Sequence, residues 1–102
     1  ARVRRAYLGV AGGSRPLPPK AVRSLGRERG LEVVEVVESS PAAAAGVQRG
    51  DIIVSLDENG IDDAAALQRL MTAERIGHPS TLVVVRGGQA VDIPVVPGEL
   101  SD

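Results

Sequence analysis

The stretch that decides the fold is Ser39-Ser40-Pro41-Ala42-Ala43-Ala44-Ala45-Gly46-Val47-Gln48-Arg49-Gly50-Asp51-Ile52-Ile53. Ser40 followed by Pro41 is typical of a helix start, because a serine side chain caps free N–H groups and proline fits the first helical position. Gly46 ends this short helix, and residues 48–51 form a turn. Residues 52–56 are mostly apolar and predict a strand. A short helix therefore leads through a turn directly into a strand.

A second strand is predicted before this stretch, at residues 31–37. It is rich in β-branched residues and is bounded by glycine on one side and by a serine-proline sequence on the other. Glu32 and Glu35 are three positions apart, which breaks the alternation of a regular strand. We therefore expect a bulge near Val33 and Val34.

Glycine and proline set the boundaries of the elements nearer the N-terminus. Residues 4–10 predict a short strand interrupted by Gly9, and the glycine-rich residues 12–16 are expected to end it. Residues 18–26 predict a short helix with prolines at its start and Gly26 at its end.

The C-terminal half predicts a turn at residues 57–60 and then a longer helix. An aspartate, Asp62 or Asp63, caps this helix, which is expected to run to about residue 74 or 75. Its apolar face follows helical spacing and consists of Leu67, Leu70 and Met71.

A hairpin closes the predicted fold. Residues 81–86 and 89–96 are strands joined at Gly87-Gly88, which is a strong hairpin signal. Pro94 lacks a backbone N–H, so we expect the last strand to have an unpaired edge there. Residues 97–102 are expected to be a flexible tail.

These elements predict a mainly β fold with helices (α+β). We expect a small β-barrel or sandwich capped by one long helix and one or two short helices. The length of 102 residues fits a single domain over residues 1–102, with its core at about residues 4–96. Because the sequence begins with alanine rather than methionine, we expect a domain of a larger protein.

Composition excludes several functional classes. No stretch approaches the roughly 18 apolar residues that a membrane span requires. The absence of cysteine excludes disulfides and thiolate sites, and Tyr7 alone provides no stacking platform for nucleic acid. The only histidine is His78, and no serine lies in a nucleophile-elbow sequence. We expect no catalytic residues, no metal site and no cofactor in this chain.

Charge is balanced overall but unevenly distributed. The net charge is −1, yet eight of the 12 basic residues lie at or before Arg29. Such asymmetry is compatible with an anion-binding face. A solvated surface whose basic and acidic parts attract each other across the fold is the favoured interpretation, because the basic residues are spread out and form no dense block.

Four motifs in order resemble a known family. They are residues 7–10 (Tyr-Leu-Gly-Val), residues 39–47, residues 49–53 (Arg-Gly-Asp-Ile-Ile) and an amphipathic helix at residues 61–71. Together they resemble a PDZ domain of the bacterial HtrA/Deg kind, which follows a trypsin-like serine protease domain. The resemblance covers roughly residues 4–96. The segment at residues 14–29 resembles an insert of the membrane-anchored, stress-sensing members, whereas Glu58 departs from the glycine common in the family's turn.

The resemblance implies a site that binds the C-terminal end of a peptide by strand addition. A loop with close backbone approach would bind the peptide carboxylate, with positive potential from Arg4 and Arg5; its residues are Arg5, Tyr7, Leu8, Gly9 and Val10. The strand that pairs with the peptide would continue through Ala11, Gly12 and Gly13. The helix wall would consist of Ala64, Leu67, Gln68 and Met71. The Ser40-Pro41, Gly46 and Gly50-Asp51 motifs are expected to be scaffold.

The leading functional hypothesis is a non-catalytic module that regulates an attached serine endopeptidase or delivers substrates to it. By resemblance, its partners are the adjacent protease domain and the C-terminal tails of unfolded or misassembled proteins, and its location is periplasmic or otherwise extracytoplasmic. We expect a role in stress response and protein quality control, with no nucleic acid bound and no membrane insertion by this domain. One alternative is an electrostatic docking domain for nucleic acid or an anionic membrane. Another is a domain that mainly packs against its protease neighbour.

Overall fold

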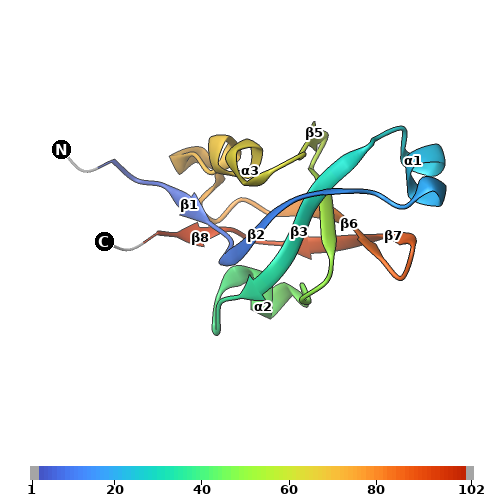
Figure 1. The fold of residues 1–102 in the computed structure, drawn as a ribbon. Helices are drawn as coiled ribbons and strands as arrows, with labels where there is room; N and C mark the ends of the chain where they lie inside the picture. Colours follow the sequence, from blue (N-terminus) through green and yellow to red (C-terminus); the bar gives the residue numbers. More distant parts are fainter. Residues whose placement is uncertain (1–2, 101–102) are drawn as a thin grey trace.

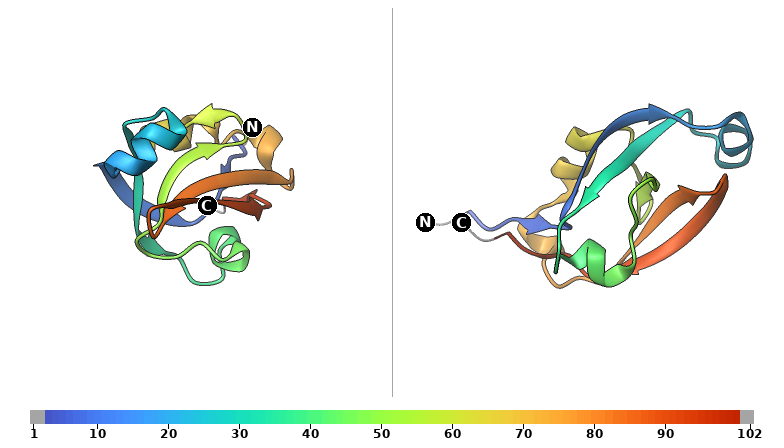
Figure 2. Two further views of the ribbon diagram at one scale, coloured as in Figure 1. Left: turned by 90° about the vertical axis from the view of Figure 1, so that its right-hand side faces the viewer. Right: turned by 60° about the horizontal axis from the view of Figure 1, so that its bottom comes forward.

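The computed structural model describes residues 3–100, and its main element is a strongly curved antiparallel sheet (Figure 1). In spatial order the sheet contains β2 (Val10–Pro16), β3 (Arg29–Val36), β4 (Ile52–Leu56), β6 (Ser80–Arg86) and β7 (Gln89–Val95). β5 (Asn59–Gly60) pairs with β4 alone, and β1 (Ala6–Tyr7) forms a separate ribbon with β8 (Gly98–Glu99). The sheet curls so that β2 and β3 face β6 and β7 (Figure 2). The predicted mainly β fold with helices is therefore confirmed.

Within the described residues there are three α-helices and one 3-10 helix, and they close the open sides of the sheet. They are α1 (Pro19–Leu25), α2 (Pro41–Ala45), α3 (Ala64–Leu70) and η1 (Ala73–Arg75). α1 lies at the end of the molecule opposite the chain termini, whereas α2 and α3 cover different sides of the curved sheet (Figure 1).

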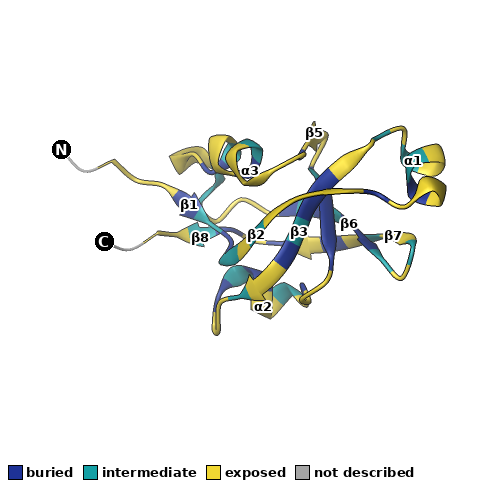
Figure 3. Cartoon of the chain, in the orientation of Figure 1, coloured by how far each residue is buried: buried dark blue, intermediate teal, exposed yellow. Residues whose placement is uncertain are grey.

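Two apolar clusters hold these layers together. Figure 3 marks the buried residues along the chain. The larger one fills the inside of the curled sheet and contacts α2 and α3, with Leu31, Val33, Ala42, Ile53, Leu56, Leu67, Leu82 and Val84 among its members. The smaller one packs α1 against the outer side of the sheet through Leu17, Ala21, Ile52, Val54 and Val85. β4 is thus covered on both faces, which explains its nearly continuous apolar sequence.

The helix, turn and strand predicted at residues 39–53 are confirmed. Ser40 Oγ accepts a hydrogen bond from the Ala43 N–H at 3.1 Å, and Gly46 ends α2 with a φ of 92°. Asp51, only 1% exposed, joins the following turn to the hairpin. Its carboxylate accepts the Gln48 N–H at 2.9 Å and two hydrogen bonds from Arg86 at 2.8 and 2.7 Å.

These hydrogen bonds also set the charge state of Asp51. Burial opposes ionisation, but the contacts with Arg86 and the Gln48 N–H outweigh it and hold the pKa of the Asp51 carboxyl below its usual value. Arg86 also donates to the Gly46 carbonyl at 3.1 Å, so one ion pair connects the end of α2, the turn and β6. The Arg-Gly-Asp motif is therefore a scaffold element.

The two strand irregularities seen in the sequence have different outcomes. The bulge is confirmed, because pairing shifts from Ala11–Glu35 to Gly12–Val33 and leaves Val34 as the extra residue. The prediction that residues 12–16 end the first strand is wrong, since β2 continues to Pro16. A Cβ on Gly12 would lie 1.7 Å from the backbone oxygen of Glu32 in β3, so the glycine permits close pairing of the two strands rather than breaking β2.

The longest predicted helix is shorter than expected. α3 ends at Leu70, and Met71 has a φ of −84° and a ψ of 58°. The Met71 carbonyl accepts the Ala6 N–H at 3.3 Å, and Thr72 forms a β-bridge with Arg5. Pairing with the N-terminal strand therefore ends the helix, and the predicted remainder is the separate η1.

The predicted tail is also corrected. Gly98–Glu99 form β8, which pairs with β1, and the Leu100 N–H donates to the Arg5 carbonyl at 2.8 Å. Only residues 101–102 of the expected tail lie outside the described residues. The hairpin at Gly87-Gly88 is confirmed, and β7, which contains Pro94, is an edge strand.

Asp51→Asn is predicted to lower stability and to change its dependence on pH. A carboxyl with a lowered folded pKa contributes stability above its unfolded pKa of about 3.9, and this contribution is lost as the pH falls through the folded pKa. We expect a loss of about 1–3 kcal/mol in the free energy of unfolding at pH 7, and a smaller difference from the wild type at pH 2–3. Urea denaturation at both pH values measures this.

The matched control is Asp92→Asn, since Asp92 is exposed on β7. It should leave stability unchanged at both pH values. Equal stability of wild type and Asp51→Asn at pH 7 would contradict the scaffold role of Asp51.

Candidate functional site

A pocket of about 150 Å³ opens between α3 and the loop that joins β1 to β2. It is lined by Ala6, Tyr7, Leu8, Gly9, Val10, Leu67, Gln68, Met71 and Leu100. The structure thus brings together the loop and helix residues that the sequence placed at a common site. Its floor is apolar, because Leu8, Leu67 and Met71 belong to the main core and are at most 6% exposed.

The loop carbonyls are bound by the scaffold. The Leu8 carbonyl accepts the Ala42 N–H of α2 at 2.8 Å, and the Gly9 carbonyl accepts the Val37 N–H at 2.7 Å. In a trans peptide, the carbonyl and the following N–H point in opposite directions. The N–H groups of Gly9 and Val10 therefore point away from α2 and β3.

These two N–H groups are available donors beside the pocket. No acceptor for the Gly9 N–H exists among residues 3–100. Val10 pairs with Val36, and the bond from the Val37 N–H to the Gly9 carbonyl makes this a non-hydrogen-bonded pair, so the Val10 N–H faces the outer edge of β2. Two convergent donors above an apolar floor suit a carboxylate attached to an apolar side chain.

Gly9 is required by both backbone conformation and space. Its φ is 88°, and a Cβ there would lie 2.3 Å from Ser40 Cβ, which belongs to the cap of α2. The loop and the α2 cap therefore fit together only with glycine at this position. This links the donor loop to the serine-proline motif that decides the fold.

The other predicted site residues take different positions. Ala11, Gly12 and Gly13 do not line the pocket but follow Val10 along β2, whose outer edge pairs with no other strand in residues 3–100. Ala64 lies exposed at the start of α3, beyond the pocket. α3 packs beside β2, so this helix and the strand that carries Ala11, Gly12 and Gly13 are neighbours in the fold.

Arg5 and Arg4 are engaged differently. Arg5 Nη2 donates to the Gln68 carbonyl at 3.0 Å, which holds its guanidinium at the C-terminal end of α3 near the pocket. Arg4 is bound to Glu99 through two hydrogen bonds of 3.2 and 3.1 Å. Of the two predicted sources of positive potential, Arg5 therefore lies near the pocket, whereas Arg4 is paired with a carboxylate.

Ala6 and Leu100 also line the pocket, and neither was predicted as a site residue. Leu100 reaches it only because β8 pairs with β1, and the predicted flexible tail concealed this. No pattern in residues 97–100 indicates the pairing.

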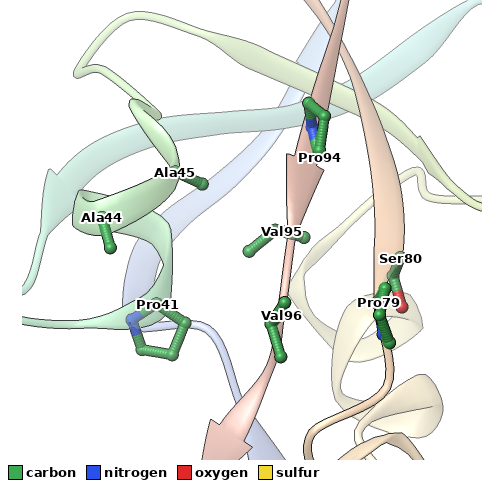
Figure 4. Close-up of a pocket in the computed structure, with 8 residues that line it drawn as sticks. All are labelled: Pro41, Ala44, Ala45, Pro79, Ser80, Pro94, Val95 and Val96. Carbon is green, nitrogen blue, oxygen red and sulfur yellow. The ribbon is translucent and has the colours of Figure 1, made fainter.

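A larger apolar pocket of about 290 Å³ lies between α2 and β7 (Figure 4). It is lined by Pro41, Ala44, Ala45, Pro79, Ser80, Pro94, Val95 and Val96, with no charged side chain. Its only hydroxyl, on Ser80, donates to the His78 carbonyl at 3.0 Å. Among residues 3–100 there is also no cluster of potential metal ligands and no helix long and apolar enough to cross a membrane.

The PDZ domain family matches residues 13–96. This chain belongs to the PDZ domain family. The periplasmic serine endoprotease DegP of Escherichia coli strain K12 is 32% identical over 92 residues, covering 90% of this chain and 19% of that protein. A probable periplasmic DegP-like serine endoprotease of Hahella chejuensis is 38% identical over 77 residues, covering 76% of this chain and 16% of that protein.

Two solved structures extend the comparison. The HtrA-type protease AlgW with a decapeptide superposes with a TM-score of 0.76 and 30% identity. This match covers 97% of the present chain and 30% of the AlgW chain. The PDZ domain of HtrA3 bound to a phage-derived ligand (FGRWV) superposes with a TM-score of 0.70 and 28% identity. This match covers 95% of the present chain and 88% of the HtrA3 chain. The expected resemblance to HtrA-type PDZ domains is confirmed. The chain spans 19% and 16% of the lengths of the two curated relatives named above.

Gly9→Ala is predicted to reduce stability as well as any binding at the loop. The added Cβ meets Ser40 and requires a left-handed backbone, so we expect a loss of about 1–3 kcal/mol in the free energy of unfolding. Gly13→Ala is the control, because a Cβ at Gly13 has no neighbour within 4 Å. Thermal unfolding compares the two, and a Gly9→Ala variant as stable as Gly13→Ala would refute this role of Gly9.

Proposed function

We propose that this PDZ domain binds the C-terminal end of extended peptides by adding the peptide as a strand to β2. The observation that carries the proposal is the pair of free N–H groups on Gly9 and Val10 above an apolar pocket. A terminal carboxylate would accept hydrogen bonds from this pair. The side chain of the last residue would then enter the pocket.

The rest of the peptide would follow the edge of β2. The segment Ala11, Gly12 and Gly13 would pair with the peptide, and its outward-facing backbone groups would form hydrogen bonds that bind without regard to sequence. The opposite wall would be α3, with Gln68 beside the pocket and Ala64 at the start of the helix. Arg5 would add positive potential near the carboxylate from its position on the Gln68 carbonyl.

The named relatives support a larger context for this function. DegP and AlgW are named as proteases, and the AlgW and HtrA3 structures are described with peptide ligands. We infer that the parent of this domain is a serine endopeptidase on the extracytoplasmic side of a bacterial cell. In it, the domain itself performs no cleavage. It would regulate the protease or deliver the exposed C-terminal tails of unfolded or misassembled proteins.

The charge distribution favours this proposal over electrostatic docking. Three arginines of the basic N-terminal third pair with carboxylates elsewhere in the fold: Arg4 with Glu99, Arg15 with Glu32 and Arg27 with Asp62. Their charge is thereby partly neutralised, so the basic and acidic parts of the sequence attract each other across the surface. Binding that weakens steeply with salt would instead support a polyanion partner.

Binding is predicted to require a free terminal carboxylate. We expect a peptide that ends in valine to lose about 1.5–3 kcal/mol of binding free energy when its C-terminus is amidated, because charge-assisted hydrogen bonds are lost. Calorimetry on the acid and the amide of one peptide measures the difference. Equal affinities would argue against the Gly9 and Val10 donors as the carboxylate site.

The last peptide residue is predicted to be aliphatic and of small or medium size. The pocket floor offers Leu8, Leu67 and Met71 and no charged partner, so a C-terminal library should be enriched in Val, Leu, Ile or Ala at the last position. The preference should be graded, because a difference of one or two methylenes is worth only about 1–3 kcal/mol. Enrichment of Asp, Glu or Lys at that position would show that this pocket does not receive the last side chain.

A further inference from the structure

We propose that Leu100 determines specificity in the pocket, by forming the outer wall that limits the size of the last peptide side chain. This inference rests on the proposed function and adds to it a residue from the opposite end of the chain. Leu100 lines the pocket together with the loop and helix residues.

The backbone pairing of β8 fixes the position of Leu100. Ala6 pairs with Glu99 and Tyr7 with Gly98, and the Leu100 N–H donates to the Arg5 carbonyl at 2.8 Å, which continues the same register. Leu100 is therefore opposite Arg5 in the ribbon. The Arg4–Glu99 ion pair reinforces this pairing from neighbouring positions.

The register also decides which way Leu100 points. Directly opposed residues of an antiparallel pair share one face, and so do residues two apart on one strand. Arg5, Tyr7 and Leu100 thus share one face of the ribbon, and Ala6, which also lines the pocket, is on the other. Tyr7 lines the pocket, and Arg5 Nη2 donates to the carbonyl of Gln68, another lining residue.

Leu100 differs from the apolar residues of the pocket floor. Leu8, Leu67 and Met71 are members of the main core, so the size of the floor is tied to the packing of the whole domain. Leu100 is 46% exposed and is not a member of that cluster. A ligand would bury part of its exposed apolar surface, and a change at this position alters the pocket without repacking the core.

The test compares Leu100→Ala and Leu100→Phe with the wild type. The probes are four peptides of identical sequence that end in Ala, Val, Leu or Phe with a free carboxylate, and the dissociation constants are measured by fluorescence polarisation. We expect Leu100→Ala to shift the preference toward Leu and Phe by up to about tenfold relative to Ala, the low end of discrimination by apolar pockets. Leu100→Phe should shift it in the opposite direction.

Val96→Ala is the matched control, because Val96 is a comparably exposed apolar residue that lines the other pocket. It should leave the order of preference unchanged, and thermal unfolding should confirm that all variants are folded. If the wild type binds and the two Leu100 variants keep its order of preference, or lose affinity equally for all four peptides, the role of Leu100 is overturned while peptide binding stands. If the wild type binds none of the four peptides, both the proposed function and this inference are overturned.

Discussion

The contact between the β1–β2 loop and the cap of α2 is the constraint on which the rest of the site depends. The carbonyls of Leu8 and Gly9 accept hydrogen bonds from the N–H groups of Ala42 and Val37, and this turns the N–H groups of Gly9 and Val10 away from α2 and β3. Gly9 permits the contact because any Cβ would meet Ser40. The donors are thus positioned by hydrogen bonds that a ligand does not have to form, which lowers the cost of ordering a binding site.

The scaffold around α2 is likewise held in place by hydrogen bonds within the protein. Ser40 caps the helix, Arg86 binds both the Gly46 carbonyl and Asp51, and Asp51 binds the turn that follows. A helix as short as Pro41–Ala45 has little stability of its own, so these contacts determine its orientation. Because the Ala42 N–H of α2 binds the Leu8 carbonyl, the motif at residues 39–53 positions the donor loop without lining the pocket itself.

The pocket combines a rigid part and an adjustable part. Its floor belongs to the main core, in which close packing resists changes of volume. Its rim includes residues of β1 and β8, a ribbon of two short strands to which the Arg4–Glu99 ion pair on the surface contributes. Such a ribbon is held less firmly than the central sheet. If the domain binds peptides as proposed, a change of ligand preference would therefore be introduced more easily at the rim than at the floor.

Much of the fold could be predicted from local signals. Proline at a helix start, glycine at its end, the adjacent glycines of the hairpin and the spacing of Glu32 and Glu35 each report a backbone requirement that acts within a few residues. The loop and helix sides of the pocket could be named as well, although through resemblance to a family rather than through spacing alone. The donor geometry of Gly9 and Val10 became visible only with the partners of the adjacent carbonyls.

The sequence by itself determined the order of the elements, the glycine at the loop and the apolar stripe of α3, because these depend on the conformational preferences of neighbouring residues. Only the tertiary structure decided where α3 ends, that β2 continues through its glycines and that Leu100 lines the pocket. Each of these depends on pairing between distant segments: Thr72 with Arg5, Gly12 with the backbone of β3, and β8 with β1. Hydrogen bonds between such distant segments outweigh helix propensity and the disorder expected of a chain end. The residues of one segment alone do not indicate which distant segment will pair with it.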